Sequence, residues 1–206
     1  MRRKFYHLEN DRGYPGRWHL SDLRDAANVE YDGREFTYGN RIDSGPPFRL
    51  GFWKEEGSAN VVPPLTLYRS YEGTSLDFTY TDDSMPVATQ RVADILGAIV
   101  GDDIQRFPVR VDRMNKGYEI INVVALADCL DVERSDVTWW EEGNDIRPEL
   151  AGLPWTVHPV FIDPTRVGDH HMFRIKTYTS PIIVSDVVKK VFEEAQVSGV
   201  LFTSVS

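Results

Sequence analysis

Two stretches of the chain have the hydrophobic spacing of an amphipathic helix. The first runs from Thr89 to Val100, and its apolar residues recur at positions i, i+3, i+4 and i+7: Val92, Ile95, Leu96 and Ile99. The second begins after Ser185, a residue typical of helix N-caps. Its apolar stripe contains Val188, Val191, Phe192 and Ala195. Gly101 and Gly199 follow the two patterns as helix-ending residues. We therefore predict helices at about residues 88–101 and 185–198.

The first 82 residues carry turn signals and short alternating segments rather than helical spacing. Pairs such as Pro15-Gly16 and Asp32-Gly33 punctuate this part of the chain. Short strands are expected between the turns, for example at Glu35–Tyr38 and Leu76–Tyr80. We also expect one helical turn around Ser21–Ala27.

The second half is expected to contain a hairpin and further strands. Phe107, Val109 and Val111 alternate with polar positions and Pro108, which predicts a half-buried or edge strand. Tyr118–Leu126 is a nearly continuous apolar run, typical of a central strand. Further strands are predicted at Val160–Ile162, Met172–Thr177 and Val200–Phe202.

Two helices among many strands, without regular alternation, predict an α+β fold. The N-terminal half should be strand-rich, and the sheet mixed or antiparallel. We interpret residues 1–206 as a single α+β domain and leave open an N-terminal lobe at residues 1–82. Hydrophobic residues make up 41% of the 206 residues, which is enough to build a large core.

The charge balance restricts the class of partner. The chain has 32 acidic and 23 basic residues, giving a net charge of -9. Because nucleic-acid binding needs clustered Lys and Arg, free nucleic acid is not an expected partner, whereas a cationic protein surface is. No apolar run approaches the ~18 residues of a membrane span, and the basic start has no apolar segment of a secretory signal behind it. We expect a soluble, cytoplasmic protein without a membrane partner.

The stretch DPTRVGDHHMFRIK, at Asp163–Lys176, gathers the residue types of a metal or acid–base site. Adjacent side chains of a strand point to opposite faces, so His170 would lie with Arg174 and His171 with Phe173. Two histidines on opposite faces cannot hold one ion, and no metal site is expected. Asp163 and Asp169 are read as turn residues, because Asp163-Pro164 and Gly168-Asp169 are ordinary turn pairs. A small hydrolase or transferase using the Asp163–His171 region stays open as an alternative.

Other catalytic patterns are missing from the sequence. The single cysteine, Cys129, lies in the apolar stretch ALADCL, which favours a small buried hydrophobe over a nucleophile. The chain contains neither a G-x-S-x-G elbow nor a glycine-rich phosphate loop. We therefore expect no enzyme activity, no catalytic residue and no cofactor.

Acidic pairs and tryptophans supply the candidate binding residues. Five acidic pairs occur along the chain: Glu55-Glu56, Asp82-Asp83, Asp102-Asp103, Glu141-Glu142 and Glu193-Glu194. Taken singly, each pair is expected to be solvated surface. The pair Glu141-Glu142 follows two tryptophans in an expected loop, and aromatic residues flanked by charge are typical interface anchors. The candidate partner-binding residues are Trp139, Trp140, Glu141, Glu142, Asp82 and Asp83. A core role for one tryptophan, and a self-associating scaffold, stay open as alternatives.

An ordered series of segments resembles one bacterial immunity-protein family. The segments are YPGRW (Tyr14–Trp18), ATQRVADIL (Ala88–Leu96), DDIQRFPVRV (Asp102–Val111), INVVALADCLDVERS (Ile121–Ser135), FIDPTRVGDHHMFRI (Phe161–Ile175) and IVSDVVKKVFEEAQVSGVLF (Ile183–Phe202). The series is similar to the eleventh catalogued family of polymorphic-toxin immunity proteins, formerly a domain of unknown function and known from myxobacteria. It covers nearly the whole chain, although Phe52–Tyr71 matches poorly.

The resemblance implies an antidote that binds and neutralises a toxin made by the same lineage. It supplies no catalytic residues and no binding residues to carry over to this chain. An acidic antidote would suit a basic toxin, because opposite charges speed association. The sequence leaves the oligomeric state open.

Overall fold

The strands form two large sheets and one small one in the computed structural model, which describes residues 3–42, 65–141, 143 and 148–206. The first large sheet contains, in order, β14 (Val200–Ser204), β1 (Phe5–Asn10), β13 (Tyr178–Ser185), β12 (Met172–Ile175) and β9 (Leu126–Ala127). Strands β9 and β12 pair in parallel, and the other neighbours pair antiparallel. This sheet therefore combines the N-terminal strand with strands that lie from Leu126 onward.

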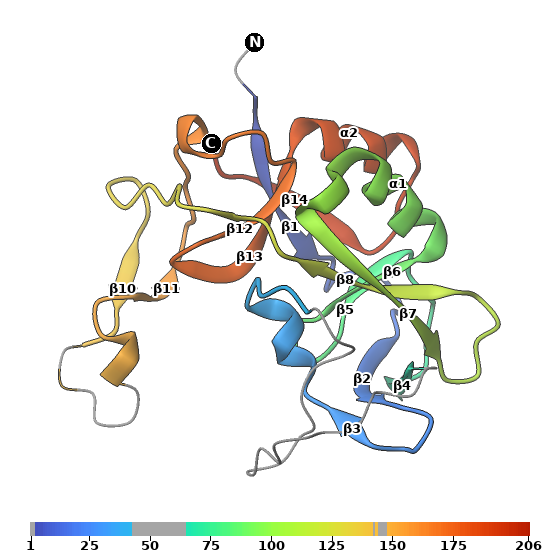
Figure 1. The fold of residues 1–206 in the computed structure, drawn as a ribbon. Coiled ribbons are helices and arrows are strands. Elements are labelled where there is room, and N and C mark those ends of the chain that lie inside the picture. The colour runs from blue at the N-terminus through green and yellow to red at the C-terminus, as the bar shows by residue number, and fades with distance from the viewer. Residues whose placement is uncertain (1–2, 43–64, 142, 144–147) are drawn as a thin grey trace.

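The second large sheet has seven strands. Their order is β3 (Glu30–Tyr31), β2 (His19–Arg24), β4 (Leu65–Tyr71), β7 (Ile104–Val111), β8 (Tyr118–Val123), β6 (Pro86–Thr89) and β5 (Phe78–Tyr80). It is also mixed, because β4 and β7 pair in parallel. The predicted α+β class and mixed sheet are confirmed (Figure 1).

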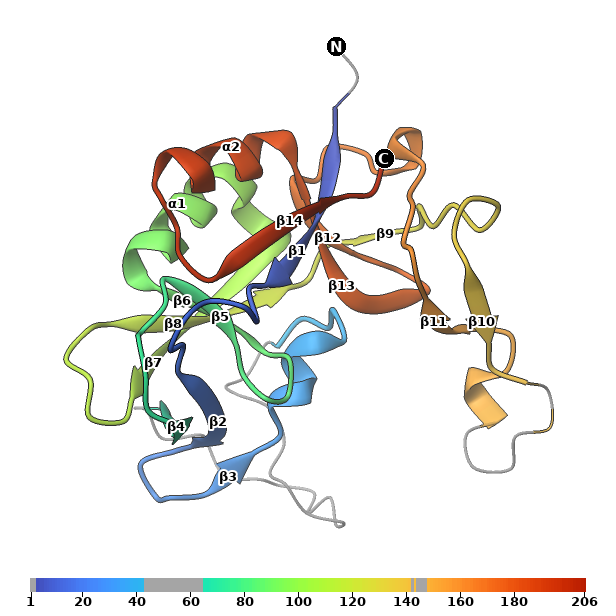
Figure 2. The same cartoon turned by 180° about the vertical axis from the view of Figure 1, so that it is seen from behind.

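Two α-helices in the described part of the chain, α1 (Gln90–Val100) and α2 (Asp186–Glu194), lie side by side in both views (Figures 1 and 2). Their buried faces share one core cluster with residues of both large sheets. Phe78 of β5 and Phe192 of α2 meet in this cluster with ring centroids 6.0 Å apart. Leu8 of β1 and Ile121 of β8 lie in the same cluster, so the helices and both sheets pack around a common interior.

Both helices begin as predicted, but the second ends early. Ser185 caps α2 by accepting the Val188 N–H, and Gly101 follows α1 with φ +52°. The prediction of a helix to residue 198 was wrong, because Gln196 adopts a left-handed φ of +49° and Val197 N–H donates to Phe192 O. Gly199 instead forms the turn into β14, where a Cβ atom would lie 2.1 Å from Phe78 O.

Two short predictions in the first half were wrong. Residues 35–37 belong to the 3-10 helix η1 (Gly33–Thr37), whose N-cap Asp32 accepts the Arg34 N–H. The segment expected to form a helical turn contains strand β2 instead, followed by a turn in which the Asp25 carboxylate accepts two backbone N–H groups. In both places an aspartate side chain binds nearby backbone donors and fixes the local structure.

The predicted hairpin of the second half is confirmed, with one change to its position in the sheet. Strands β7 and β8 pair antiparallel, and every residue of β8 is buried. Strand β7 is not an edge strand, because Val109 pairs with Leu65 of β4; Pro108 lies just before this paired segment and is exposed. Val160–Ile162 is not a strand, since only Ile162 forms an isolated bridge, with Leu130.

Strand β12 is buried on both faces, contrary to the expected alternation. Phe173 and Ile175 point into the core as predicted, but Arg174 is also buried, with 1% of its surface exposed. Its guanidinium donates to Thr179 O at 2.7 Å and to Phe36 O at 3.2 Å. Burial lowers the pKa of Arg174, and the group nevertheless stays charged because arginine does not lose its proton in proteins.

We expect Arg174→Ala to lower the free energy of unfolding by about 3 kcal/mol or more, because it empties a buried position and leaves the buried Phe36 carbonyl and the partly buried Thr179 carbonyl without this donor. Urea denaturation followed by circular dichroism measures this change. Arg110→Ala, which removes an exposed arginine of β7, serves as the control and should change stability by less than about 0.5 kcal/mol. Equal effects of the two substitutions would contradict the structural role of Arg174.

Candidate functional site

A pair of strands projects from the body of the protein on the side away from the helices (Figures 1 and 2). We call this pair, β10 (Val137–Trp139) with β11 (Pro154–Val157), the arm. The strands run antiparallel with a bulge between Thr138 and Trp139. Beyond the bulge, Trp140 N–H donates to Leu153 O at 3.0 Å and extends the pairing. The segment expected to be a loop is therefore a strand as far as Trp139.

The base of the arm is fixed to the body by core and polar contacts. Val137 and Val157 pack against a buried cluster that includes Phe173 and Ile183. Phe161 N–H donates to Ser135 Oγ at 2.9 Å. The guanidinium of Arg134 lies over the Phe161 ring, 4.5 Å from its centroid. These contacts hold the direction in which the arm leaves the body.

The arm carries three tryptophans outside the core. The rings of Trp140 and Trp155 are stacked, with centroids 4.6 Å apart and planes 11° apart. Trp155 is 56% exposed and Trp139 is 43% exposed. Neither of the two adjacent tryptophans belongs to the core, so the alternative of a core tryptophan in this pair was wrong. Trp155 was not predicted as a binding residue. The segment PWTV could have indicated it, because it places a tryptophan in a short strand-like run, as at Trp139.

The acidic residues chosen with these tryptophans are only partly described. Glu141 is exposed directly after Trp140. Glu142 lies outside the described residues. Of this predicted acidic pair, the structure therefore describes one carboxylate next to the tryptophans, that of Glu141.

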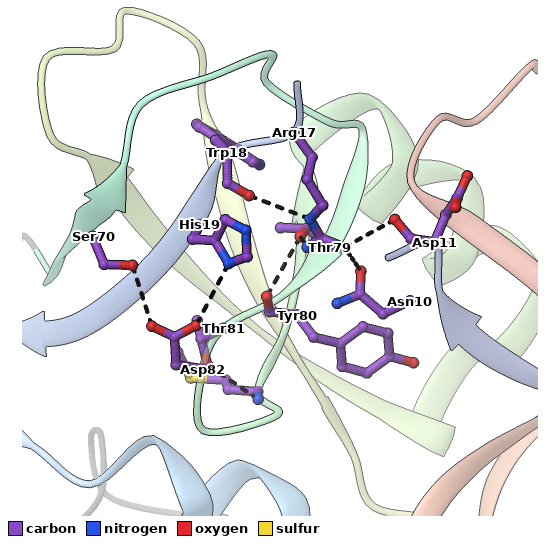
Figure 3. A network of polar contacts seen from close by, with 11 residues as sticks. Asn10, Asp11, Arg17, Trp18, His19, Ser70, Thr79, Tyr80, Thr81 and Asp82 are labelled. Atoms are coloured by element: carbon purple, nitrogen blue, oxygen red, sulfur yellow. Dashed lines mark hydrogen bonds and ion pairs between the residues drawn. The ribbon is translucent and has the colours of Figure 1, made fainter. Parts of the chain in front are cut away.

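Asp82 and Asp83 lie elsewhere, in the turn between β5 and β6, and Figure 3 shows Asp82 with its polar neighbours. Ser70 Oγ donates to the Asp82 carboxylate at 3.2 Å, and His19 Nδ1 lies 3.9 Å from its other oxygen. This is not the order of a catalytic triad, in which the imidazole stands between the hydroxyl and the carboxylate. The five described residues of the predicted set are thus divided between the region of the arm and this turn.

Carboxylates gather around Asp83. Partial burial raises the pKa of Asp83, and the neighbouring Asp32, Asp82 and Asp22 carboxylates raise it further against the opposing charge of Arg34. We call Asp22, Asp32, Asp82 and Asp83 the acidic patch. Arg34 pairs with Asp32 at 2.6 Å and Arg24 lies 3.6 Å from Asp22, so the four carboxylates outnumber the arginines beside them and give this part of the surface a negative potential.

The strands beneath this turn are joined by a buried arginine (Figure 3). Arg17 donates to Asn10 Oδ1 at 2.8 Å and to Thr79 Oγ1 at 3.1 Å, linking the end of β1 to β5. The adjacent Trp18 is completely buried and is part of the core. Arg17 therefore supports the fold rather than presenting a free charge.

The imidazole rings of the tandem histidines have different partners, although the His171 backbone N–H donates to the same Asp103 carboxylate that His170 contacts. His170 Nδ1 lies 2.7 Å from Asp103 Oδ1, whereas His171 Nδ1 lies 2.8 Å from Ser185 Oγ at the start of α2. Asp163 caps the 3-10 helix η4 (Pro164–Arg166) by accepting the Thr165 N–H, as the turn interpretation predicted. The alternative enzyme would need these side chains to meet at one site. Instead, the side chains of His170, His171 and Asp163 each contact a different partner.

Cys129 is completely buried, and burial raises its pKa to about 12, so the thiol stays protonated at neutral pH. Within residues 3–42, 65–141, 143 and 148–206, no three His, Cys, Asp or Glu side chains are grouped so that they could hold a metal ion. The same described residues contain no helix with the length and apolar character to cross a membrane.

The fold and the arm define a strand-rich α+β protein that exposes aromatic side chains on a projecting pair of strands. A family model, that of the Immunity protein family (Imm11), matches residues 33–206. Because the match covers most of the chain, the protein belongs to this immunity protein family, as the ordered segments indicated. A comparison with curated proteins gave no match.

We expect Asp83→Asn to stabilise the isolated protein at pH 7. The pKa of Asp83 is raised because its charged form is disfavoured in the folded state. This penalty lowers stability at pH values above the pKa of the folded state, and it disappears once the pH falls below the pKa of the unfolded state. The gain should be about 0.5 kcal/mol or less, because solvent screens this exposed group. Urea denaturation at pH 7 should show it, and the variant and wild type should coincide near pH 3.

Asp169→Asn provides the matched control, since Asp169 is an exposed aspartate outside the acidic patch. It should leave the urea midpoint unchanged at both pH values. A loss of stability for Asp83→Asn at pH 7 would show that Asp83 makes favourable contacts and that repulsion does not dominate the patch.

Proposed function

We propose that the protein is an antidote that binds a cognate bacterial toxin and neutralises it by occluding the toxin's active surface. The observation that carries this proposal is the exposure of Trp139 and Trp155 on the arm. Large aromatic side chains of this kind are the usual anchors of protein interfaces. Membership of an immunity protein family supports a toxin as the partner.

The charge of the chain supports a basic toxin. The net charge is -9, and carboxylates are concentrated in the acidic patch and beside the arm. An acidic inhibitor attracts a cationic enzyme over a distance and orients it before contact. We propose that the encounter occurs in the cytoplasm and involves neither nucleic acid nor a membrane as partner.

The proposed action needs no catalysis and no cofactor, only a surface held in a fixed shape. We propose that the chain acts as a single domain. The support for this is that β1 pairs between β13 and β14, and that Leu8 and Phe78 share a core cluster with Phe192 of α2. In a single domain, the arm and the acidic patch would be presented to the toxin on one scaffold.

Co-expression with the toxin encoded by the neighbouring gene tests the proposal. The protein should restore growth and should elute with the toxin as one complex on a sizing column. A toxin inactivated by substitution of its own catalytic residue serves as the control for growth. Failure to restore growth together with the lack of a complex would refute the antidote function. The protein run alone tests the scaffold alternative, which predicts an apparent size that rises with concentration.

The association rate with the toxin should fall steeply as salt is added. Exposed charges steer association at low ionic strength and are screened at high ionic strength. We expect a decrease of about tenfold or more between about 0.05 M and 0.5 M NaCl, with a much smaller change in the dissociation rate. Stopped-flow mixing of the purified proteins measures both rates. An association rate independent of salt would remove the charge-steering part of the proposal.

A further inference from the structure

We infer that the outer face of Trp155 is the anchoring site for an arginine side chain of the toxin. This inference rests on the proposed antidote function and names the chemistry of one contact within it. The observations behind it are the ring stack, the fixed base of the arm and the excess of acidic residues in the sequence between Asp131 and Glu149.

The two faces of the Trp155 indole have different surroundings. One face lies against Trp140 in the parallel stack, with the ring planes 11° apart, which restricts rotation of the indole. More than half of the Trp155 side chain is nevertheless exposed. No cation of the described residues lies over its ring, whereas Arg134 covers Phe161 at the base of the arm. A flat aromatic face is therefore held open to a partner.

One ring of the stack lies on a strand and the other follows directly after one. Trp155 belongs to β11, and Val157, two residues further along the same strand, is buried in the core cluster at the base of the arm. Trp140 N–H donates to Leu153 O and Gly152 N–H donates to Trp140 O, which continues the pairing next to the stack. A side chain held in this way loses little conformational freedom on binding, which favours affinity.

The acidic residues in the neighbouring sequence favour a cationic side chain as the group that binds the Trp155 ring. Between Asp131 and Glu149 the sequence contains seven acidic residues and two basic ones. A nucleobase would also stack on indole, but its phosphates would be repelled here. A cation is attracted both by the ring face and by the carboxylates. Arginine fits better than lysine, because its planar guanidinium stacks on an indole and is less strongly hydrated.

The test begins with two substitutions of Trp155 and a matched control. Trp155→Ala should raise the dissociation constant of the complex with the inactivated toxin by about tenfold or more, and Trp155→Phe should raise it less. Tyr71→Ala removes an aromatic residue of β4 that is 64% exposed, and it should change affinity by less than about twofold. Calorimetric titration measures the affinities, and urea denaturation verifies that each variant is folded.

A double-mutant cycle then identifies the chemistry of the contact. Each surface arginine of the inactivated toxin is replaced by glutamine and titrated against the wild type and Trp155→Ala. One arginine should weaken binding to the wild type and should have little further effect on the Trp155→Ala variant, because the two side chains share one interaction. A lysine in this role, or effects that add for every arginine, would overturn the inference.

The outcomes separate this inference from the proposed function. If the wild type binds the toxin and Trp155→Ala binds equally well, the arginine site is wrong while the antidote function stands. If the wild type forms no complex with the toxin and gives no protection, the antidote function itself is refuted, and the arginine site with it.

Discussion

The buried guanidinium of Arg174 connects parts of the chain that are far apart in sequence. It lies on β12 and binds carbonyl groups of residues 179 and 180, at β13, and of Phe36 in η1. Removing a charge from water is costly, and the hydrogen bonds of the two terminal nitrogens offset part of this cost, while Nε has no hydrogen-bond partner. Strands β12 and β13 and the η1 segment must therefore be in place together. The arrangement couples the C-terminal sheet to the first half of the protein.

This coupling determines where a binding surface can lie. Helices α1 and α2 cover the shared core on one side, and the arm leaves the body on the other (Figures 1 and 2). Since Val137 and Val157 are packed at its base, the arm inherits the rigidity of the core while its tryptophans stay exposed. An inhibitor that acts by occlusion needs this combination of a firm support and an uncovered apolar surface.

Local patterns in the sequence predicted the elements whose structure is decided locally. The spacing around Val92 and the apolar run of β8 located a helix and a central strand correctly. Burial of Arg174 could not be predicted, because it depends on Phe36 reaching β12 from a distant part of the chain. The stack of Trp140 on Trp155 likewise depends on the register and bulge of the arm, which hydrophobic spacing does not specify. The tryptophans themselves were visible, but their pairing was not.

The arm has a further consequence for the protein before any partner arrives. Within the described residues, β10 pairs only with β11, so each strand has an edge without a strand neighbour. Open edges of this kind promote aggregation, because they accept a strand from another molecule. The negative charge in the sequence around the arm repels a second copy of the same chain. The carboxylates that would attract a basic toxin thus also oppose self-association and keep the exposed surface of the arm free to bind.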